Sequence, residues 1–394
     1  MTGRPMTPGR LYAGTEASTR AQVRLSSPVW LAVLAAVALS VLGSVSIATT
    51  EPALASRQAI FLCVGLACAA LVALVPARAL QMASWFVLAI AVALLVFVLL
   101  PFVPKWLVTP RNGARAWIDL GVADFQPSEL AKIAFIISVS QWLAIRGSPR
   151  TIRALLVPAA VLLALVALIV LEPDLGSALL FAPTLFAILA AAGARWRHLL
   201  VVVLIAVSAA PIGYFALLKP YQRARIDAIA AQIRGDTRFE RDIGFQGWRA
   251  MRLVGAGGIA GNDVAHARAL IVHNKLPEEH NDMIFAVVAC RFGFSGAIAT
   301  LLGYALYLLA AMAVAISARD GFSKLVAVGI GALIFSQMVV NIGMTIGLLP
   351  ITGVTLPFVS YGGSSLVMTW VMTGLLVGLG IRPPRGGEKD PFDA

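Results

Sequence analysis

The 394-residue chain is 59% hydrophobic and only 13% charged, and its mean hydropathy of +0.87 excludes an ordinary soluble domain. The sequence therefore predicts a polytopic membrane protein. Its net charge of +12 suits anionic lipids and an anionic substrate, whereas the basic residues do not cluster on a soluble face as nucleic-acid binding would need. The three cysteines, Cys63, Cys68 and Cys290, lie in apolar runs without metal-ligand spacing, so neither a disulfide framework nor a zinc site is expected.

Ten apolar runs are near the length that crosses a bilayer. We place them at 28–49, 58–76, 81–103, 128–145, 152–171, 175–193, 198–218, 283–316, 322–348 and 361–381. The prediction is an all-α fold: one membrane domain over 28–382 with about ten transmembrane helices and a large outer loop at 219–282, between helices 7 and 8. The eighth run is too long for a straight perpendicular helix, so we expect it to tilt or to project from the bilayer.

Both ends of the chain are polar. Residues 1–27 predict a disordered cytoplasmic arm rather than a cleaved signal, and 383–394 predict a cytoplasmic tail. With the amino terminus in the cytoplasm, the basic short loops fall on one side, as the positive-inside rule requires. The residues concerned are Arg78, Arg146, Arg150, Arg153, Arg195, Arg197, Arg319 and Lys324.

Charged residues gather at the outer ends of the predicted spans. The loop at 110–127 is followed by PSELAK, in which Glu129 and Lys132 share one helix face. They are either a local ion pair, or Lys132 joins Arg115 in supplying positive charge to an anionic headgroup. Between the fifth and sixth spans, in LEPDLGSA, Pro173 ends one helix and Asp174 is expected to cap the next.

The outer loop predicts an amphipathic helix at 221–233 and a second short helix at 245–253. The following GAGGIAG, at 255–261, matches a loose dinucleotide-binding pattern. No strand precedes it, so we reject that match and expect a tight surface turn.

The stretch KLPEEHNDMIFAVVACRFGF, at 275–294, changes abruptly from polar to apolar. A carboxylate at such a boundary is half desolvated, which raises its basicity. Asn281 and Asp282 are either ordinary helix caps or parts of a site. Between the ninth and tenth spans, LLPITGVTLPFVSYGGSS predicts irregular backbone, which must be buried in protein or line a wet cavity. We interpret it as a wall of an outward-facing cleft, with Ser360 and Ser364 as candidate substrate contacts.

Together these motifs resemble the SEDS family (shape, elongation, division and sporulation), which includes RodA, FtsW and SpoVE. NGARAWIDLG…FQPSELAK, EPDLGSA, GAGGIAG, LPEEHNDMIFAVVA and GLLPITGVTLPFVSYGGSS occur in the family's order, from about residue 30 to 382. The resemblance implies a bacterial peptidoglycan glycosyltransferase that polymerises lipid II at the outer face of the cytoplasmic membrane, usually with a class B penicillin-binding transpeptidase. It also implies roles for the family's acidic residue, at Asp282, and for its outer-cavity positions at Arg115, Trp117 and Lys132.

The chain departs from the family at two places. A pair of glutamates usually follows the FAVIA-like run, but this chain has Cys290 and Arg291, and Asn274 replaces an acidic residue before the LPE segment. An arginine at that depth needs a partner, so we expect Arg291 to find backbone carbonyls or a carboxylate. The carboxylates considered are Glu129, Glu172 and Asp174.

The chemistry implied is one inverting displacement, because an α-linked donor gives a β-linked product. Asp282 is the candidate base, with positive charge at the pyrophosphate from Arg115, Lys132 and either Arg223 or Arg225. Glu278, Glu279 and His280 are further candidate substrate contacts. No dedicated metal cage is present in the sequence, although an assisting divalent cation stays open. Two alternatives remain: a lipid II flippase or other transporter, and an inactive scaffold for the transpeptidase. We expect the outer loops at 111–127, 219–282 and 350–364 to converge over one cleft, with Asp282 in its wall.

Overall fold

The computed structural model describes residues 27–104, 106–108, 114–121, 123–212, 220, 223–224, 227–228, 231, 234, 236, 244–318 and 320–382. Residues 1–26 of the predicted arm, the predicted tail at 383–394, Arg225 and most of the predicted helix at 221–233 lie outside this part of the chain. The fold is a helical bundle with one small hairpin, β1 (Ile118–Asp119) antiparallel to β2 (Asp124–Phe125).

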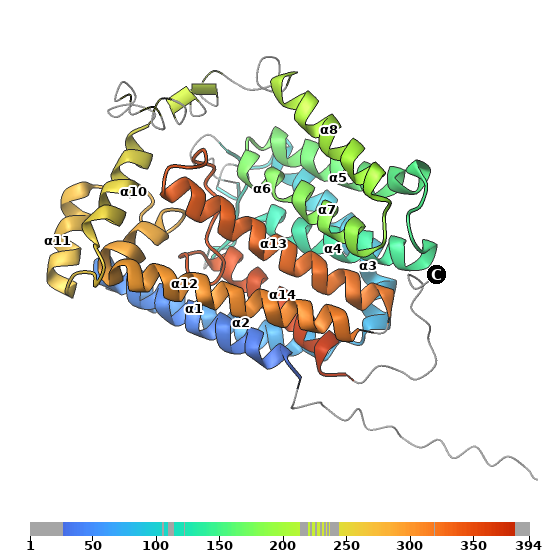
Figure 1. The fold of residues 1–394 in the computed structure, drawn as a ribbon, viewed down its shortest axis with the longest axis horizontal. Helices are drawn as coiled ribbons and strands as arrows, with labels where there is room; N and C mark the ends of the chain where they lie inside the picture. Colours follow the sequence, from blue (N-terminus) through green and yellow to red (C-terminus); the bar gives the residue numbers. More distant parts are fainter. Residues whose placement is uncertain are drawn as a thin grey trace, which may run out of the picture.

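Every predicted apolar run contains a helix (Figure 1). The bundle consists of α1 (Val29–Thr50), α2 (Pro52–Ala73), α3 (Ala77–Leu99), α4 (Pro127–Arg146), the 3-10 turn η1 (Ile152–Leu155) with α5 (Leu156–Leu171), α6 (Leu175–Leu179), α7 (Phe181–Ala191), α8 (Trp196–Ile212), α12 (Ile284–Ser317), α13 (Gly321–Thr345) and α14 (Gly363–Gly380). Eight helices in the described part are long and apolar enough to cross a membrane.

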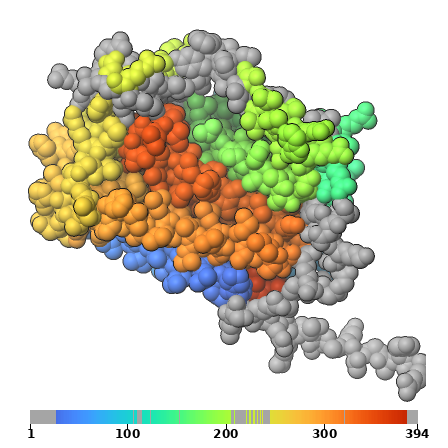
Figure 2. Space-filling view, viewed as in Figure 1, coloured from blue at the N-terminus to red at the C-terminus, as the bar shows by residue number. Residues whose placement is uncertain are grey.

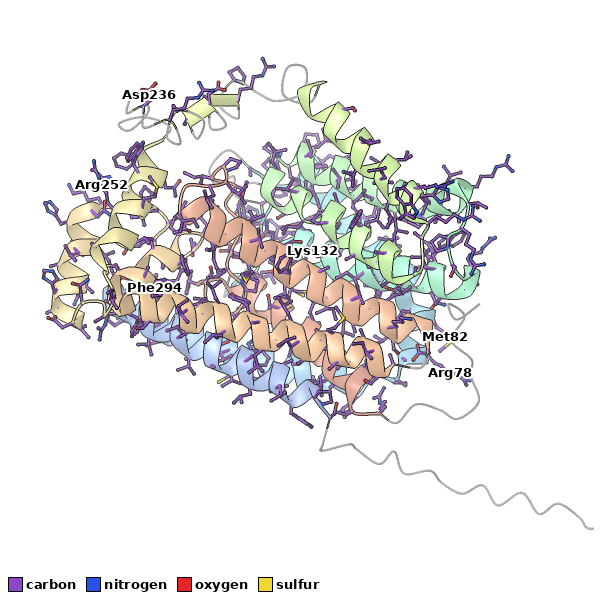
Figure 3. The ribbon with its side chains drawn as sticks, in the orientation of Figure 1. Arg78, Met82, Lys132, Asp236, Arg252 and Phe294 are labelled. Atoms are coloured by element: carbon purple, nitrogen blue, oxygen red, sulfur yellow. The ribbon has the colours of Figure 1, made fainter. Side chains whose placement is uncertain are left out.

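The packing places α4 and α13 at the centre of the bundle. α13 contacts α4, α7 and α12, while α1 lies along α12 and α2 lies along α14 (Figure 1). Most residues of α4 are buried, including Phe135 and Ile136, whereas α2 exposes apolar residues such as Ile60 and Leu71, as a lipid-facing helix does. Arg78 lies at one end of the bundle, and Arg252 and Phe294 lie at the opposite end (Figure 3).

Several predicted boundaries were wrong. α2 begins at Pro52 and α3 at Ala77, because both helices continue through polar residues that a hydropathy window excludes. Gln58, the first residue of the second predicted run, is buried and donates to the Ser360 carbonyl at 2.9 Å. The sixth run is divided into α6 and α7, since Pro183 cannot donate to the preceding turn.

The eighth run is not one continuous helix. Gly293 has φ 66° and ψ −158°, which divides α12 into a short helix at 284–292 and a long one at 294–317. Ala311 lies beside Gly331, and the Met283 sulfur lies 3.9 Å from the Thr345 hydroxyl. Along α12 these contacts are 28 residues apart, but only 14 apart along α13, so the short helix turns back at Gly293.

The described part of the outer loop forms a helical hairpin over one end of the bundle. It consists of α10 (Phe245–Ala256), which confirms the helix predicted at 245–253, and α11 (Val264–Asn274), which was not predicted. Figure 2 shows these two helices (yellow) against the end of α12 (orange). The glycine-rich turn between them does form, but it packs against the break in α12 and is not a simple surface turn.

Candidate functional site

The polar stretch that precedes α12 forms a tight turn with Asp282 at its end. The Asn281 and Met283 amides both donate to the Glu278 carbonyl, and Glu278 itself has φ 55°. The N-cap residue of α12 is Met283, and it makes no side-chain capping bond, so Asn281 and Asp282 lie before the N-cap position. Asp282 is only 6% exposed. A nearly buried carboxylate is suited to proton transfer.

Asn341 holds Asp282 in place from α13. This amide is fully buried and donates to the carbonyl of Asp282 and to that of Val354, each at 2.7 Å. It joins the turn before α12 to the loop before α14. In the same loop, a Cβ built on Gly353 would lie 3.9 Å from the Asp282 carboxylate oxygen. The loop backbone therefore faces the carboxylate across an ordinary van der Waals gap.

Ser360 connects the same two segments a second time. Its hydroxyl donates to the Asn281 carbonyl at 2.6 Å and accepts from the Leu356 amide at 2.7 Å. The next amide, of Tyr361, donates to the His280 carbonyl at 2.8 Å. Ser360 is 3% exposed, so it holds the two loops together.

The loop before α14 also meets the start of α4 and the turn before α6. The Gln126 amide donates to the Ser364 hydroxyl at 3.1 Å, and the Gln126 side chain donates to the Asp174 carboxylate at 3.0 Å. A Cβ on Gly176 would overlap the Thr352 carbonyl, so α6 lies directly against the loop. The segments 126–132, 172–177, 278–282 and 349–365 therefore converge. Of the three loops expected to meet, 219–282 and 350–364 are joined by the bonds of Ser360, and 111–127 reaches 350–364 through Gln126.

Lys132 lies inside the bundle, on α4 (Figure 3). Its ammonium is 2.7 Å from the Glu129 carboxylate, and both side chains are almost fully buried. The predicted local ion pair between Glu129 and Lys132 is therefore confirmed. Because Glu129 offsets the charge of Lys132, the pair presents little net charge to a ligand.

The turn before α6 contains two different carboxyl groups. Asp174 caps α6 by accepting from the Ser177 amide at 3.0 Å, as predicted. Glu172 is 1% exposed, and neither of its oxygens has a hydrogen-bond partner in the described part of the chain. Burial, and then the nearby Asp174, raise the pKa of Glu172 to about 9. Glu172 is therefore neutral at pH 7, a property that its position in the sequence does not reveal.

Burial is the main cause of the pKa shifts of Glu279 and His280. Burial and Glu51 raise the pKa of Glu279, while a hydrogen bond with Thr50 lowers it. Burial lowers the pKa of His280, against the opposing charges of Glu278 and Glu51. Burial therefore favours the neutral form of the His280 ring, which packs edge-on against Tyr361 at 5.8 Å between centroids.

The other predicted substrate contacts are Arg115, Trp117, Arg223 and Arg225. Arg115 and Trp117 are half-buried before β1, in a hairpin whose second strand contacts α14. In the part of the chain that the structure describes, no hydrogen bond joins either residue to the 278–282 turn. Arg223 is half-buried, and Arg225 lies outside the described residues. The described residues contain no cluster of three or more His, Cys, Asp or Glu side chains that could hold a metal.

Arg291 has the backbone partner that was expected but none of the expected carboxylates. Its guanidinium donates to the Asn262 carbonyl in the turn between α10 and α11. It also contributes to lowering the pKa of Asp263. Because the short helix of α12 turns back at Gly293, Arg291 is at the outer hairpin and not beside Glu129, Glu172 or Asp174.

Comparison with known proteins gives one consistent result. The family model described as "Cell cycle protein" (FtsW, RodA, SpoVE) matches residues 22–381. Stage V sporulation protein E of Bacillus subtilis is 34% identical over 300 residues, covering 75% of this chain and 78% of that protein. Peptidoglycan glycosyltransferase MrdB of Escherichia coli is 32% identical over 268 residues, covering 68% of this chain and 71% of that protein.

A solved structure has the same fold. It is a chain of a peptidoglycan synthase complex that coordinates polymerization and crosslinking. It matches with a TM-score of 0.76 and 32% identity, over 90% of this chain and 97% of its own. The chain belongs to the FtsW/RodA/SpoVE family of multi-pass membrane proteins.

Proposed function

We propose that this protein is a peptidoglycan glycosyltransferase that polymerises lipid II into glycan strands. The observation that carries the proposal is the position of Asp282, which is nearly buried, lies just before the N-cap residue of α12 and is held through its backbone carbonyl by Asn341. Family membership and the activity of MrdB of Escherichia coli support the same reaction.

In the proposed reaction, Asp282 accepts the proton of the acceptor sugar's hydroxyl as that oxygen attacks the donor's anomeric carbon. The bond to the lipid pyrophosphate breaks on the opposite side, so the configuration inverts and no covalent enzyme intermediate forms. Arg115 is the proposed source of positive charge for the departing pyrophosphate, with Trp117 and Arg223 or Arg225 as further contacts. Lys132 pairs with Glu129, so its charge is largely offset before it can act on the pyrophosphate.

The surroundings of the proposed reaction follow from the orientation of the spans. We place the amino terminus in the cytoplasm of a bacterium and the converging loops at the outer face of the cytoplasmic membrane. A class B penicillin-binding transpeptidase is the proposed partner, because the similar solved structure belongs to a complex that combines polymerization and crosslinking.

The test is strand formation by the purified chain from lipid II, with and without a cognate transpeptidase, read as a ladder of glycan lengths. The proposal predicts strands that depend on Asp282. A parent chain that makes no strands with its partner present would instead favour the scaffold alternative.

A further inference from the structure

The break at Gly293 leaves backbone groups that need partners. The last carbonyls of the helix at 284–292 and the first amides of the helix at 294–317 have no partners within their own helices. Unsatisfied polar groups are costly away from water, and Gly293 at the break is buried, so the break needs an external source of donors and acceptors. The turn between α10 and α11 supplies both.

Acceptors come from the glycine-rich part of the turn. The Phe294 amide donates to the Gly258 carbonyl at 2.9 Å, and the Ser295 amide donates to the Ile259 carbonyl at 3.3 Å. These bonds cap the start of the long helix. Phe294 lies beside α11 at the end of the bundle, where the hairpin meets α12 (Figure 3).

Donors come from Asn262. Its amide donates to the Arg291 carbonyl at 3.1 Å, and its side chain donates to the Cys290 carbonyl at 2.8 Å. The same side chain donates to the Ala256 carbonyl at 3.1 Å, which ties it to the end of α10. Arg291 returns a bond to the Asn262 carbonyl. One residue thus caps the end of the short helix and binds it to the hairpin.

Close approach of the two backbones requires glycine on both sides. A Cβ on Gly257 would overlap the Ala289 carbonyl, and one on Gly261 would overlap the Arg291 carbonyl. A Cβ on Gly293 would overlap the Gly261 amide. We call the turn at 257–262, with its bonds to 290–295, the hairpin clamp.

The clamp acts on one end of a lever whose other end carries Asp282. Nine residues of helix are about 14 Å long, so a rotation of roughly 4° about the clamp moves the far end by about 1 Å. Asn341 holds that far end through the Asp282 carbonyl. Displacements of about 1 Å at a reacting group can reduce a rate on the order of 100-fold.

We propose that Asn262 is a positioning residue for Asp282 and acts through the hairpin clamp and the short helix at 284–292. The proposal rests on the role of Asp282 given under Proposed function. The outer hairpin, on this account, determines where the base of the reaction stands.

The test compares Asn262→Ala with Asn274→Ala. Asn274 is the matched control because it is in the same hairpin and its described hydrogen bonds, to Arg249, stay within the hairpin. We expect Asn262→Ala to lower kcat for strand synthesis about tenfold or more with KM for lipid II within about twofold, because the base moves while the binding groups do not. Asn274→Ala should stay within about twofold of the parent.

A second readout does not depend on activity. Cys290 is buried in the short helix, and its carbonyl is bound by Asn262. With the two cysteines of α2 replaced by alanine, Asn262→Ala should increase maleimide labelling of Cys290 on the order of tenfold, because the end of the short helix opens more often. Asn274→Ala should label at the parent rate.

An unchanged kcat for Asn262→Ala would overturn the proposal, and so would equal losses in the two variants or a loss confined to KM. If the parent makes no strands, the proposed function fails, and Cys290 labelling decides on the clamp by itself. Equal labelling of the parent and Asn262→Ala would then show that Asn262 does not hold the short helix.

Discussion

Removal of Lys132 alone should cost far more stability than removal of the whole ion pair. In Lys132→Met, the Glu129 carboxylate stays buried with no cation beside it, since the 2.7 Å contact with Lys132 is lost and Glu129 is only 5% exposed. Breaking one side of a buried pair costs about 3–5 kcal/mol. In Glu129→Gln with Lys132→Met, no charge is left buried, so we expect most of that stability to return.

Thermal unfolding in detergent measures the stability of each variant, and strand synthesis from lipid II measures its activity. If the pair is only structural, the double variant recovers both stability and activity. If Lys132 also stabilises the departing pyrophosphate, the double variant recovers stability but stays at least tenfold less active. A Lys132→Met variant as stable as the parent would refute the reasoning, because the buried charge would then cost nothing.

Three further outcomes follow from single residues. The pKa of Glu172 is raised from 4.5 to about 9, so between these pH values the folded chain keeps a proton on Glu172 that the unfolded chain releases. The parent should therefore lose stability as pH rises through this window, by up to about 1.4 kcal/mol per pH unit. Glu172→Gln should flatten this dependence of stability on pH. Gly257→Ala should lower the thermal midpoint, whereas Gly255→Ala, with no atom within 4 Å of the added methyl, should not; equal effects would contradict the clamp geometry. Asn341→Ala removes a donor from each of two buried carbonyls, at about 1–3 kcal/mol each, while Ser336→Ala on the same helix loses a bond to Ala332 within its own helix. Strand synthesis and the thermal midpoints of the two variants test this difference.

The spans could be predicted from the sequence because burial in a bilayer needs long apolar runs, whatever the neighbouring helices do. The break in α12 could not, since CRFGFSGAIA continues the apolar run and a glycine within it is not by itself a break signal. It is stabilised by bonds to a turn that lies 28 to 36 residues earlier in the chain. α11 was missed because only Ala267 and Ile271 are buried, which gives too weak a pattern.

The candidate site was predicted in its segments but not in its contacts. Polar residues next to apolar runs indicated 126–132, 172–177, 278–282 and 349–365. The residues that join them are Asn341, Gln126 and Ser360, and each makes at least one bond to a residue 48 or more positions away. An amide such as Asn341 inside an apolar run was the one available signal, because a buried amide needs partners. Its partners could only be found in the folded chain.

The most direct test of the central claim is strand synthesis by Asp282→Asn. Asparagine has nearly the same shape as aspartate, and the contact with Asn341 uses the backbone carbonyl of residue 282, so the fold, membrane insertion and partner binding should be preserved. Asparagine cannot accept a proton at neutral pH, so strand synthesis from lipid II should fall by a factor of roughly 10² to 10⁴. A variant that folds normally and polymerises lipid II at the parent rate would show that Asp282 is not the base.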